Sequence, residues 1–249
     1  MFFNHAQRPK PKQADHPRHM HLEYEILLFM AGGPSYVVDG RKYPLSRGTL
    51  LLVPPNSYHF ALVEDAAVYH RYLLNFRGDA FDRQLLEDAF PKEARCYTLE
   101  EGHSIMQAFA RLDGLNKKEL GQHKNAMLHS FCTQILLEIL MLDPDRSHDV
   151  KQYPVLVYID KHLDTIRSAE DVADAFFVSV SAICHQFRDK MGISLMKYIR
   201  QKRLLMAKHM LEKGERPMSV YGKCGFSDYT TFYKAYVRYF GAPPSGEMK

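Results

Sequence analysis

The sequence predicts an α+β protein: an antiparallel β-barrel with following helices, and then an all-α C-terminal part. Three observations predict this class. Between residues 23 and 76, short apolar runs alternate with Gly, Pro and Asn about ten residues apart, which is typical of a barrel or sandwich. After residue 76, apolar residues recur at helical spacing. In the last hundred residues or so, one helical pattern occurs twice.

Composition and charge narrow the class of protein. The chain has 249 residues, 46% of them hydrophobic, which indicates one large or two ordinary globular domains. The longest apolar run, residues 26–31, is too short to span a bilayer, and the N-terminus lacks the apolar segment of a secretory signal. The four cysteines lie far apart, which favours reduced thiols. We therefore expect a cytoplasmic protein without a membrane partner.

The net charge of +4 conceals an asymmetry along the chain. Residues 1–150 carry a net charge of −2, whereas residues 151–249 carry +6. A basic C-terminal part is typical of a DNA-binding domain, although a lysine-rich solvated surface would give the same balance.

The elements follow in chain order. Residues 1–18, with their run Arg8-Pro-Lys-Pro-Lys12, are expected to be a flexible basic arm. Residues 19–142 are predicted to be a barrel followed by a helical hairpin. Within it, Asp39-Gly40 predicts a tight β-hairpin, because a type I′ turn needs positive φ at both central positions.

Residues 122–142 predict a helix with one apolar stripe. The stripe suits either core packing or a dimer contact, and we expect the hairpin to serve a homodimer; it consists of Leu128, Phe131, Ile135, Ile139 and Leu142. Residues 143–150 have the composition of a linker, and residues 151–249 form the C-terminal domain.

The two copies of the C-terminal pattern each predict a helix-turn-helix. Residues 171–192 match residues 219–241, so that Ser179 pairs with Ser227 and Phe187 with Tyr236. Ser179 and Asp228 can cap the second helix of each copy, and residues 193–213 predict a helix that joins the copies. The apolar anchors point inward, so a second set of residues faces outward and could reach base edges: Ser181, Cys184, His185, Tyr229, Thr230, Tyr233 and Lys234.

Residues 155–245 resemble the DNA-binding domain of AraC/XylS-type transcription regulators. The resemblance rests on G-I-S-x-x-x-Y-I-x-x-x-R (192–203), A-x-x-x-L (207–211), G-F-S-D-x-x-x-F (225–232) and G-x-x-P (241–244). It implies that the outward residues contact bases. Basic side chains around the two helices would hold phosphates: Arg188, Lys190, Lys197, Arg238 and also Lys234.

The N-terminal part resembles the cupin motifs. His19-x-His21-x-x-x-Glu25-(six)-Gly32 is similar to the first motif, and Gly48-(five)-Pro54-x-Asn56-x-x-His59 to the second. On one continuous strand His19, His21 and Glu25 would share a face. With His59, they form a reasonable donor set for Mn, Fe, Ni or Zn, or else a hydrogen-bonded pocket wall.

The combined pattern predicts a sequence-specific DNA-binding transcription regulator whose barrel senses a small ligand. The competing hypothesis is a metal-dependent cupin oxygenase or isomerase with a helical docking tail. We favour the regulator, expect no catalytic residues and no required cofactor, and count double-stranded DNA, a small effector and RNA polymerase as candidate partners. Candidate pocket residues are Tyr24, Tyr36, His59, Phe60, Tyr69 and Tyr72.

Overall fold

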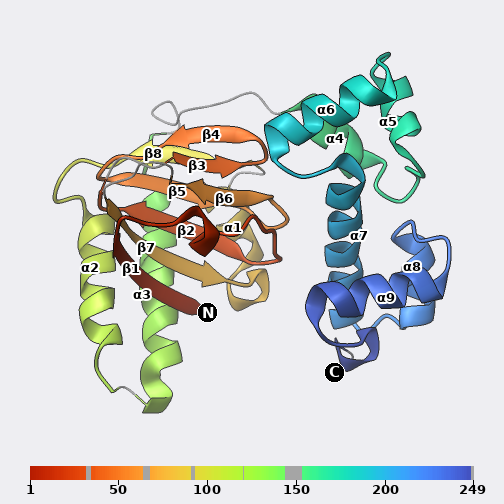
Figure 1. Ribbon diagram of the computed structural model, residues 1–249. Coiled ribbons are helices and arrows are strands. Elements are labelled where there is room, and N and C mark those ends of the chain that lie inside the picture. The colour runs from red at the N-terminus through yellow and green to blue at the C-terminus, as the bar shows by residue number, and fades with distance from the viewer. Residues whose placement is uncertain (32–34, 64–67, 91–92, 120, 144–152, 248–249) are drawn as a thin grey trace. The chain divides into compact units, whose positions relative to one another are not determined.

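A computed structural model describes residues 1–31, 35–63, 68–90, 93–119, 121–143 and 153–247. The chain divides into two compact units, Met1–Lys151 and Gln152–Lys249, each of which is described by itself. Most of the expected linker at 143–150 lies outside the described residues. The predicted fold class is confirmed, because antiparallel strands with following helices build the first unit, and all elements of the second unit in its described part, residues 153–247, are helices (Figure 1).

The strands of the first unit form two antiparallel sheets. The larger sheet has the order β1-β7-β2-β5-β8 and the smaller one β4-β3-β6. The strands are β1 (Phe2–Pro9), β2 (Tyr24–Phe29), β3 (Ser35–Val38), β4 (Arg41–Pro44), β5 (Thr49–Val53), β6 (His59–Leu62), β7 (Val68–Phe76) and β8 (Arg95–Thr98).

One buried cluster draws side chains from both sheets, including Leu27, Tyr36, Tyr43 and Leu51. The sheets therefore share a core. The predicted hairpin is confirmed, since Asp39 and Gly40 both have positive φ (49° and 74°) between β3 and β4.

Helices α1 (Arg83–Ala89), α2 (Ser104–Asn116) and α3 (Lys124–Ile139) pack on the other face of the larger sheet. In Figure 1, α2 and α3 run side by side along this sheet. The apolar stripe predicted for residues 122–142 belongs to this core: Leu128, Ile135 and Ile139 are buried there, and Phe131 and Leu142 pack against it. The stripe is thus covered by other residues of the first unit and is not exposed for a dimer contact.

The N-terminal arm differs from the expectation of flexibility. Residues Phe2–Pro9 form β1, which pairs with β7 along its whole length, from Phe2 opposite Asn75 to Pro9 opposite Val68. Phe3 is buried against the α2 side of the sheet, where its ring lies 6.1 Å from that of Tyr72. Strand pairing and this one apolar anchor outweigh the basic residues that suggested an arm in solvent.

The second unit consists of helices α4 (Pro154–Lys161), α5 (Ala169–Ala175), α6 (Val180–Met191), α7 (Leu195–Glu212), α8 (Pro217–Lys223) and α9 (Tyr229–Phe240). The pairs α5/α6 and α8/α9 are the two predicted helix-turn-helix copies, and α7 joins them. None of the helices in the described parts of the chain has the length and apolar composition needed to cross a bilayer.

The turns of the two copies are built alike. After α5, Phe177 N–H donates to the carbonyl of Asp174 and Val178 N–H to that of Ala173. After α8, Gly225 and Phe226 make the same two bonds, to Gly222 and Tyr221. This pair of bonds is the Schellman motif, which requires a left-handed residue directly after the helix cap. Phe177 (φ 53°) and Gly225 (φ 79°) fill that position.

Buried Arg203 on α7 lies between the loop that precedes the first copy and the turn of the second copy. Its guanidinium donates to the carbonyl oxygens of Leu163 (2.7 Å) and Ile166, in the loop between α4 and α5. A Cβ on Gly225 would stand 2.8 Å from the Arg203 guanidinium and 2.7 Å from the Asp164 carbonyl oxygen. Glycine is therefore needed at 225 both for its backbone angle and for this close approach.

Candidate functional site

The second helix of each copy is held by a cap and two buried anchors. Ala182 N–H donates to Ser179 Oγ (3.2 Å) at the start of α6, and Thr231 N–H donates to Asp228 Oδ1 (2.8 Å) at the start of α9. The anchors are fully buried and lie four residues apart in each helix: Ile183 and Phe187 in α6, Phe232 and Tyr236 in α9. The opposite faces of α6 and α9 are consequently free to meet a partner.

The predicted base-contact residues lie on these outer faces. Ser181 and His185 of α6 are exposed, as are Thr230, Tyr233 and Lys234 of α9. Cys184 and Tyr229 are half-buried beside them. His185 Nδ1 lies 2.7 Å from Asp189 Oδ2, which orients the ring along the face of α6. The structure thus gathers one set of polar and aromatic groups on each of the two helices.

The predicted phosphate contacts are exposed basic side chains of the same unit. Arg188 and Lys190 lie in the last turns of α6, Lys197 in the first turn of α7, and Arg238 near the end of α9. The Lys190 ammonium stands 4.3 Å from the centre of the Tyr153 ring. Arg203, the last residue of the 192–203 motif, is buried and serves the packing described above.

In the first unit, His19, His21, Glu25 and His59 come together. Each residue offers one ligand atom, and all four atoms lie within 4.8 Å of one another. The residues do not share one strand as expected, because β2 begins only at Tyr24. His19 reaches the site through an isolated bridge in which the backbones of His19 and His59 exchange two hydrogen bonds (2.9 and 3.2 Å).

The hydrogen bonds of two imidazoles fix their tautomers. His19 Nδ1 lies 2.8 Å from the carbonyl oxygen of Pro17, and His59 Nδ1 lies 2.8 Å from that of Ser57. A carbonyl can only accept, so each Nδ1 carries the proton and each Nε2 presents a lone pair. This is the arrangement in which metal-binding histidines are usually held. His59 Nε2 is buried 3.4 Å from Glu25 Oε2 and makes no hydrogen bond within the described residues.

Burial and charge set the protonation of the cluster. Burial alone would raise the pKa of Glu25, but the hydrogen bond from His21 (2.9 Å) and the nearby imidazoles lower it to about 2. Burial lowers the pKa of His59 to about 4, against the opposing charge of Glu25. Burial also acts to lower the pKa of His21, yet Glu25 raises it overall. At neutral pH the site therefore contains a carboxylate and a neutral His59, both competent donors for a cation.

The candidate pocket residues lie in different places: some between the two sheets, some on the helix side of the larger sheet, and one beneath Arg18. Tyr36, Tyr69 and His59 lie near one another between the sheets, with the rings of Tyr36 and His59 6.0 Å apart. Tyr24 and Tyr72 instead pack on the helix side of the larger sheet. Phe60 lies under the Arg18 guanidinium, 4.6 Å from its ring centre. The six residues therefore do not line one pocket.

One exposed residue of the second unit lies outside every predicted set. Phe177, in the turn between α5 and α6, is 97% exposed and has a left-handed backbone (φ 53°). Its alignment with Gly225 in the repeat is the one sequence signal that could have singled it out.

Comparisons with known proteins agree with this arrangement. The AraC-like ligand binding domain family matches residues 6–135, just over half of the chain, and a helix-turn-helix domain family matches residues 172–249. The HTH-type transcriptional activator RhaS of Escherichia fergusonii is 23% identical over 96% of this chain and 90% of its own length. RhaS of Escherichia coli O1:K1 / APEC is 25% identical with the same coverage. An apo variant of ToxT from Vibrio cholerae has a TM-score of 0.43 and 13% identity, over 98% of this chain and 96% of ToxT.

The fold and the two matched domains define a DNA-binding transcription regulator with a ligand-binding N-terminal domain. The chain belongs to the AraC/XylS family of regulators, as the C-terminal motifs indicate. The regulator hypothesis is confirmed. The protein is not an enzyme, and the oxygenase or isomerase alternative is set aside.

The buried cluster makes the stability of the first unit depend on pH. The folded pKa of His59 is about 4, below its unfolded value of 6.5, so the unfolded chain binds the extra proton between these values. Stability should therefore fall as pH decreases from 6.5 to 4, by an amount on the order of 2–3 kcal/mol. The pKa of His70 is also lowered, mainly by burial, and acts in the same direction, whereas the raised pKa of His21 acts in the opposite direction.

Calorimetry of the full chain with a chelator present measures this dependence. His59→Leu should remove most of the loss, whereas His70→Gln should remove less, because His70 is the less buried of the two. Glu25 does not contribute until pH falls below its unfolded value, toward about 2. An unchanged slope in His59→Leu would show that other groups carry the dependence.

Proposed function

We propose that α6 and α9 are the two recognition helices of this regulator and that they read adjacent major-groove segments of one operator. One observation supports this proposal. Both helices are capped and anchored by two buried residues, and their outer faces hold the predicted base-contact groups. Two such helices joined by α7 suit half-sites one helical turn, about 34 Å, apart. We propose that this regulator acts in the cytoplasm. When it is bound to DNA, it contacts RNA polymerase.

Base contacts and phosphate contacts should respond differently to substitution. His185→Ala and Lys234→Ala should weaken binding to the preferred site about 5- to 150-fold each and leave nonspecific binding nearly unchanged. Arg188→Ala should weaken both kinds of binding and lower the slope of log affinity against log salt by about one. Gel shifts on the DNA upstream of the protein's own gene, at salt concentrations between about 50 and 200 mM, measure both quantities.

The outcome separates the two helices. If Lys234→Ala leaves affinity for the preferred site unchanged, α9 does not read bases. If no sequence-specific shift appears at any salt concentration, the assignment of both recognition helices is wrong.

We further propose that the ligand site of the first unit is the cluster of His19, His21, Glu25 and His59, and that it holds a divalent metal ion. Three imidazoles and one carboxylate suit Mn, Fe, Ni or Zn. The two fixed tautomers support this, because they leave the Nε2 lone pairs of His19 and His59 facing the cluster. Regulators of this family generally need no cofactor, so the ion acts here as an effector or as part of the effector site.

Metal binding should require these four residues and no histidine outside the cluster. Chelator-treated protein should take up about one equivalent of metal per chain, with a rise in Tm on addition of Mn, Fe(II), Ni or Zn salts. His59→Leu should abolish both effects. His70→Gln, which removes a histidine outside the cluster, should retain them. Metal uptake that persists in His59→Leu would place the ion elsewhere, and no uptake in the wild type would contradict the proposal.

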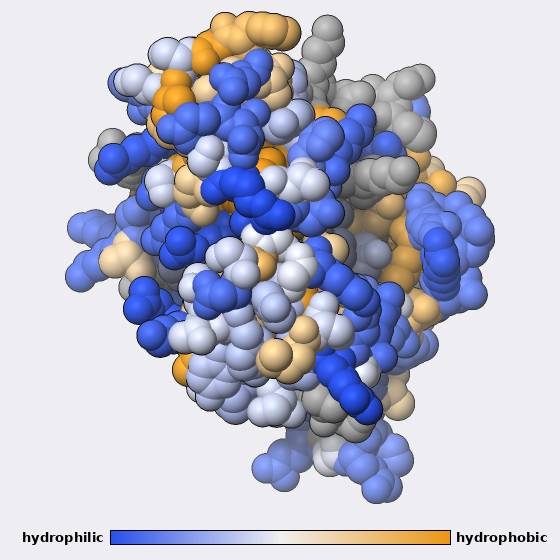
Figure 2. Space-filling view, turned by 90° about the vertical axis from the view of Figure 1, so that its right-hand side faces the viewer, coloured by the Kyte–Doolittle hydropathy of each residue, from blue (hydrophilic) through white to orange (hydrophobic). Residues whose placement is uncertain are grey.

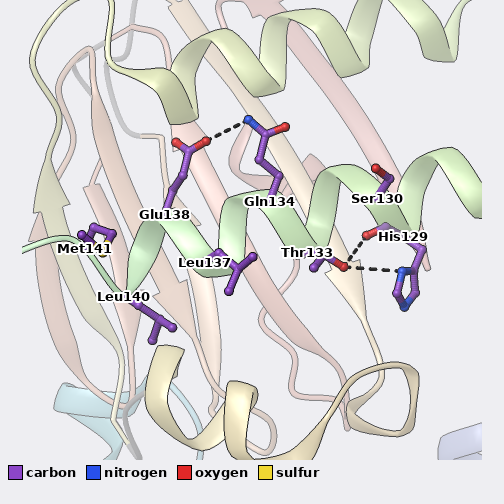
Figure 3. A pocket seen from close by; sticks show the side chains of 8 residues that line it. All are labelled: His129, Ser130, Thr133, Gln134, Leu137, Glu138, Leu140 and Met141. Carbon is purple, nitrogen blue, oxygen red and sulfur yellow. Dashed lines mark hydrogen bonds between the residues drawn. The ribbon is translucent and has the colours of Figure 1, made fainter.

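A homodimer is the third proposal, and its contact must use the outer face of α3. The stripe predicted for this role packs inside the unit, but the opposite face carries exposed Leu137, and exposed Leu140 and Met141 follow directly after the helix, beside a shallow pocket. Figure 3 shows Leu137 between Thr133 and Leu140, and the hydrogen bonds of the polar rim: Thr133 to the backbone oxygen and the ring of His129, and Gln134 to Glu138. A second copy placed on this face would cover its apolar atoms.

Light scattering after size exclusion tests the dimer. Wild-type protein at micromolar concentration should have twice the monomer mass. Leu137→Lys should give the monomer mass without lowering the Tm, because Leu137 is half-exposed. Ala110→Lys, on the exposed side of α2, is the matched control and should stay dimeric. A monomeric wild type, or a dimeric Leu137→Lys, would refute this contact.

A further inference from the structure

The two helix-turn-helix copies differ at one backbone position that ought to be glycine in both. The turns share the same two hydrogen bonds and the same left-handed residue, which is Gly225 in the second copy and Phe177 in the first. A bulky residue at positive φ is a genuine outlier, because its Cβ crowds the neighbouring carbonyl.

No packing in the described structure compensates for this strain. Gly225 lies against the Arg203 guanidinium and the Asp164 carbonyl, so its turn is covered by protein. The Phe177 side chain is 97% exposed, so its ring gains almost nothing from folding. A strained residue that contributes no packing indicates a role in binding.

Phe177 is the centre of a small apolar surface. Val178 and Val180, the latter being the first residue of α6, are 37% and 36% exposed. We call these three residues the apolar tip of α6. Figure 2 shows a group of hydrophobic atoms at the top of the view. The surface below them is mainly hydrophilic.

We propose that the apolar tip of α6 contacts DNA and recognises thymine through its 5-methyl group. The tip stands at the N-terminal end of α6, and this is the end of a recognition helix that contacts base edges. The thymine methyl is the apolar group that the major groove displays, and valine and phenylalanine side chains suit it. The first turn of α6, residues 180–183, carries no acidic group that would repel phosphates.

The second copy has no counterpart of the apolar tip among its described residues. Phe226, the counterpart of Val178, is buried, and α9 begins with Asp228 as its cap and then Tyr229 and Thr230. The beginning of α9 therefore offers mainly polar groups, whereas that of α6 offers apolar ones. Recognition of thymine methyls by the apolar tip should be confined to the half-site under α6. This inference rests on the proposed placement of α6 in the major groove.

Uracil interference tests it with the full-length protein. The DNA upstream of the protein's own gene is partly substituted with deoxyuridine, and the bound and free fractions from a gel shift are cleaved at uracil. Loss of one methyl contact should weaken binding about fourfold. For the wild type, one or more thymines in one half-site should therefore be depleted of uracil in the bound fraction, and those in the other half-site should not.

A matched pair of variants assigns the effect to the tip. Phe177→Asn is polar and tolerates the left-handed backbone, so it should erase the interference at one or more positions while the Tm stays equal or rises. Phe177→Leu keeps an apolar group of similar size and should retain most of the pattern. Val180→Ser should erase interference in the same half-site.

Three results would overturn the proposal. A shift without any uracil interference would contradict methyl recognition but not the recognition helices. Interference that both Phe177→Asn and Val180→Ser leave unchanged would show that a side chain outside the tip contacts the methyl group. The absence of any specific shift would remove the proposed recognition helices and this inference together.

Discussion

The geometry of the DNA-binding unit depends on one buried guanidinium. Arg203 extends from the connecting helix α7 and satisfies two carbonyl groups in the loop before α5. The guanidinium also closes against the turn of the second copy, where only glycine leaves room for it. One side chain of the connecting helix thus contacts both the loop that precedes the first copy and the turn of the second copy. Since a buried charge must be fully hydrogen-bonded to be tolerated, these parts cannot shift independently without a large cost.

The first unit is organised around a second buried charge, the Glu25 carboxylate. Hydrogen bonds and opposing charges from histidines hold it ionised despite its burial. His19 lies six residues before it in the chain, whereas His59 reaches it from a distant segment, the start of β6. The bridge between His19 and His59 also ties the segment that follows β1 to the small sheet. A ligand that binds the imidazoles would therefore act on the N-terminal strand region and on both sheets at once, which is what a sensor needs in order to convert binding into a change of packing.

Much of this could be predicted from the sequence, because the strongest signals are local. The repeat, the caps at Ser179 and Asp228, and the Asp39-Gly40 hairpin each depend on a few neighbouring residues. What could not be predicted depends on distant partners. The strand β1 is stabilised by its pairing with β7, which no local pattern reveals. Tyr24 and Tyr36 resemble each other in sequence context, but strand register sends them to opposite cores. Arg203 reads as one more surface cation until the carbonyls that surround it are known.

The comparison of the two copies explains why Phe177 is where it is. A repeated unit inherits the same backbone demands, so both turns require a left-handed residue. In the second copy the neighbouring guanidinium excludes any side chain, and the requirement for glycine is absolute. In the first copy the side chain points into solvent, so the only penalty is backbone strain, and the position is open to a side chain that binds something. A new contact can therefore arise at this turn of the first copy, where the side chain is exposed, and not at that of the second copy, where protein covers the turn. At the same turn position, Gly225 is unstrained and Phe177 is strained. The left-handed backbone is what the fold requires at this position, and the phenylalanine side chain is what the proposed binding requires.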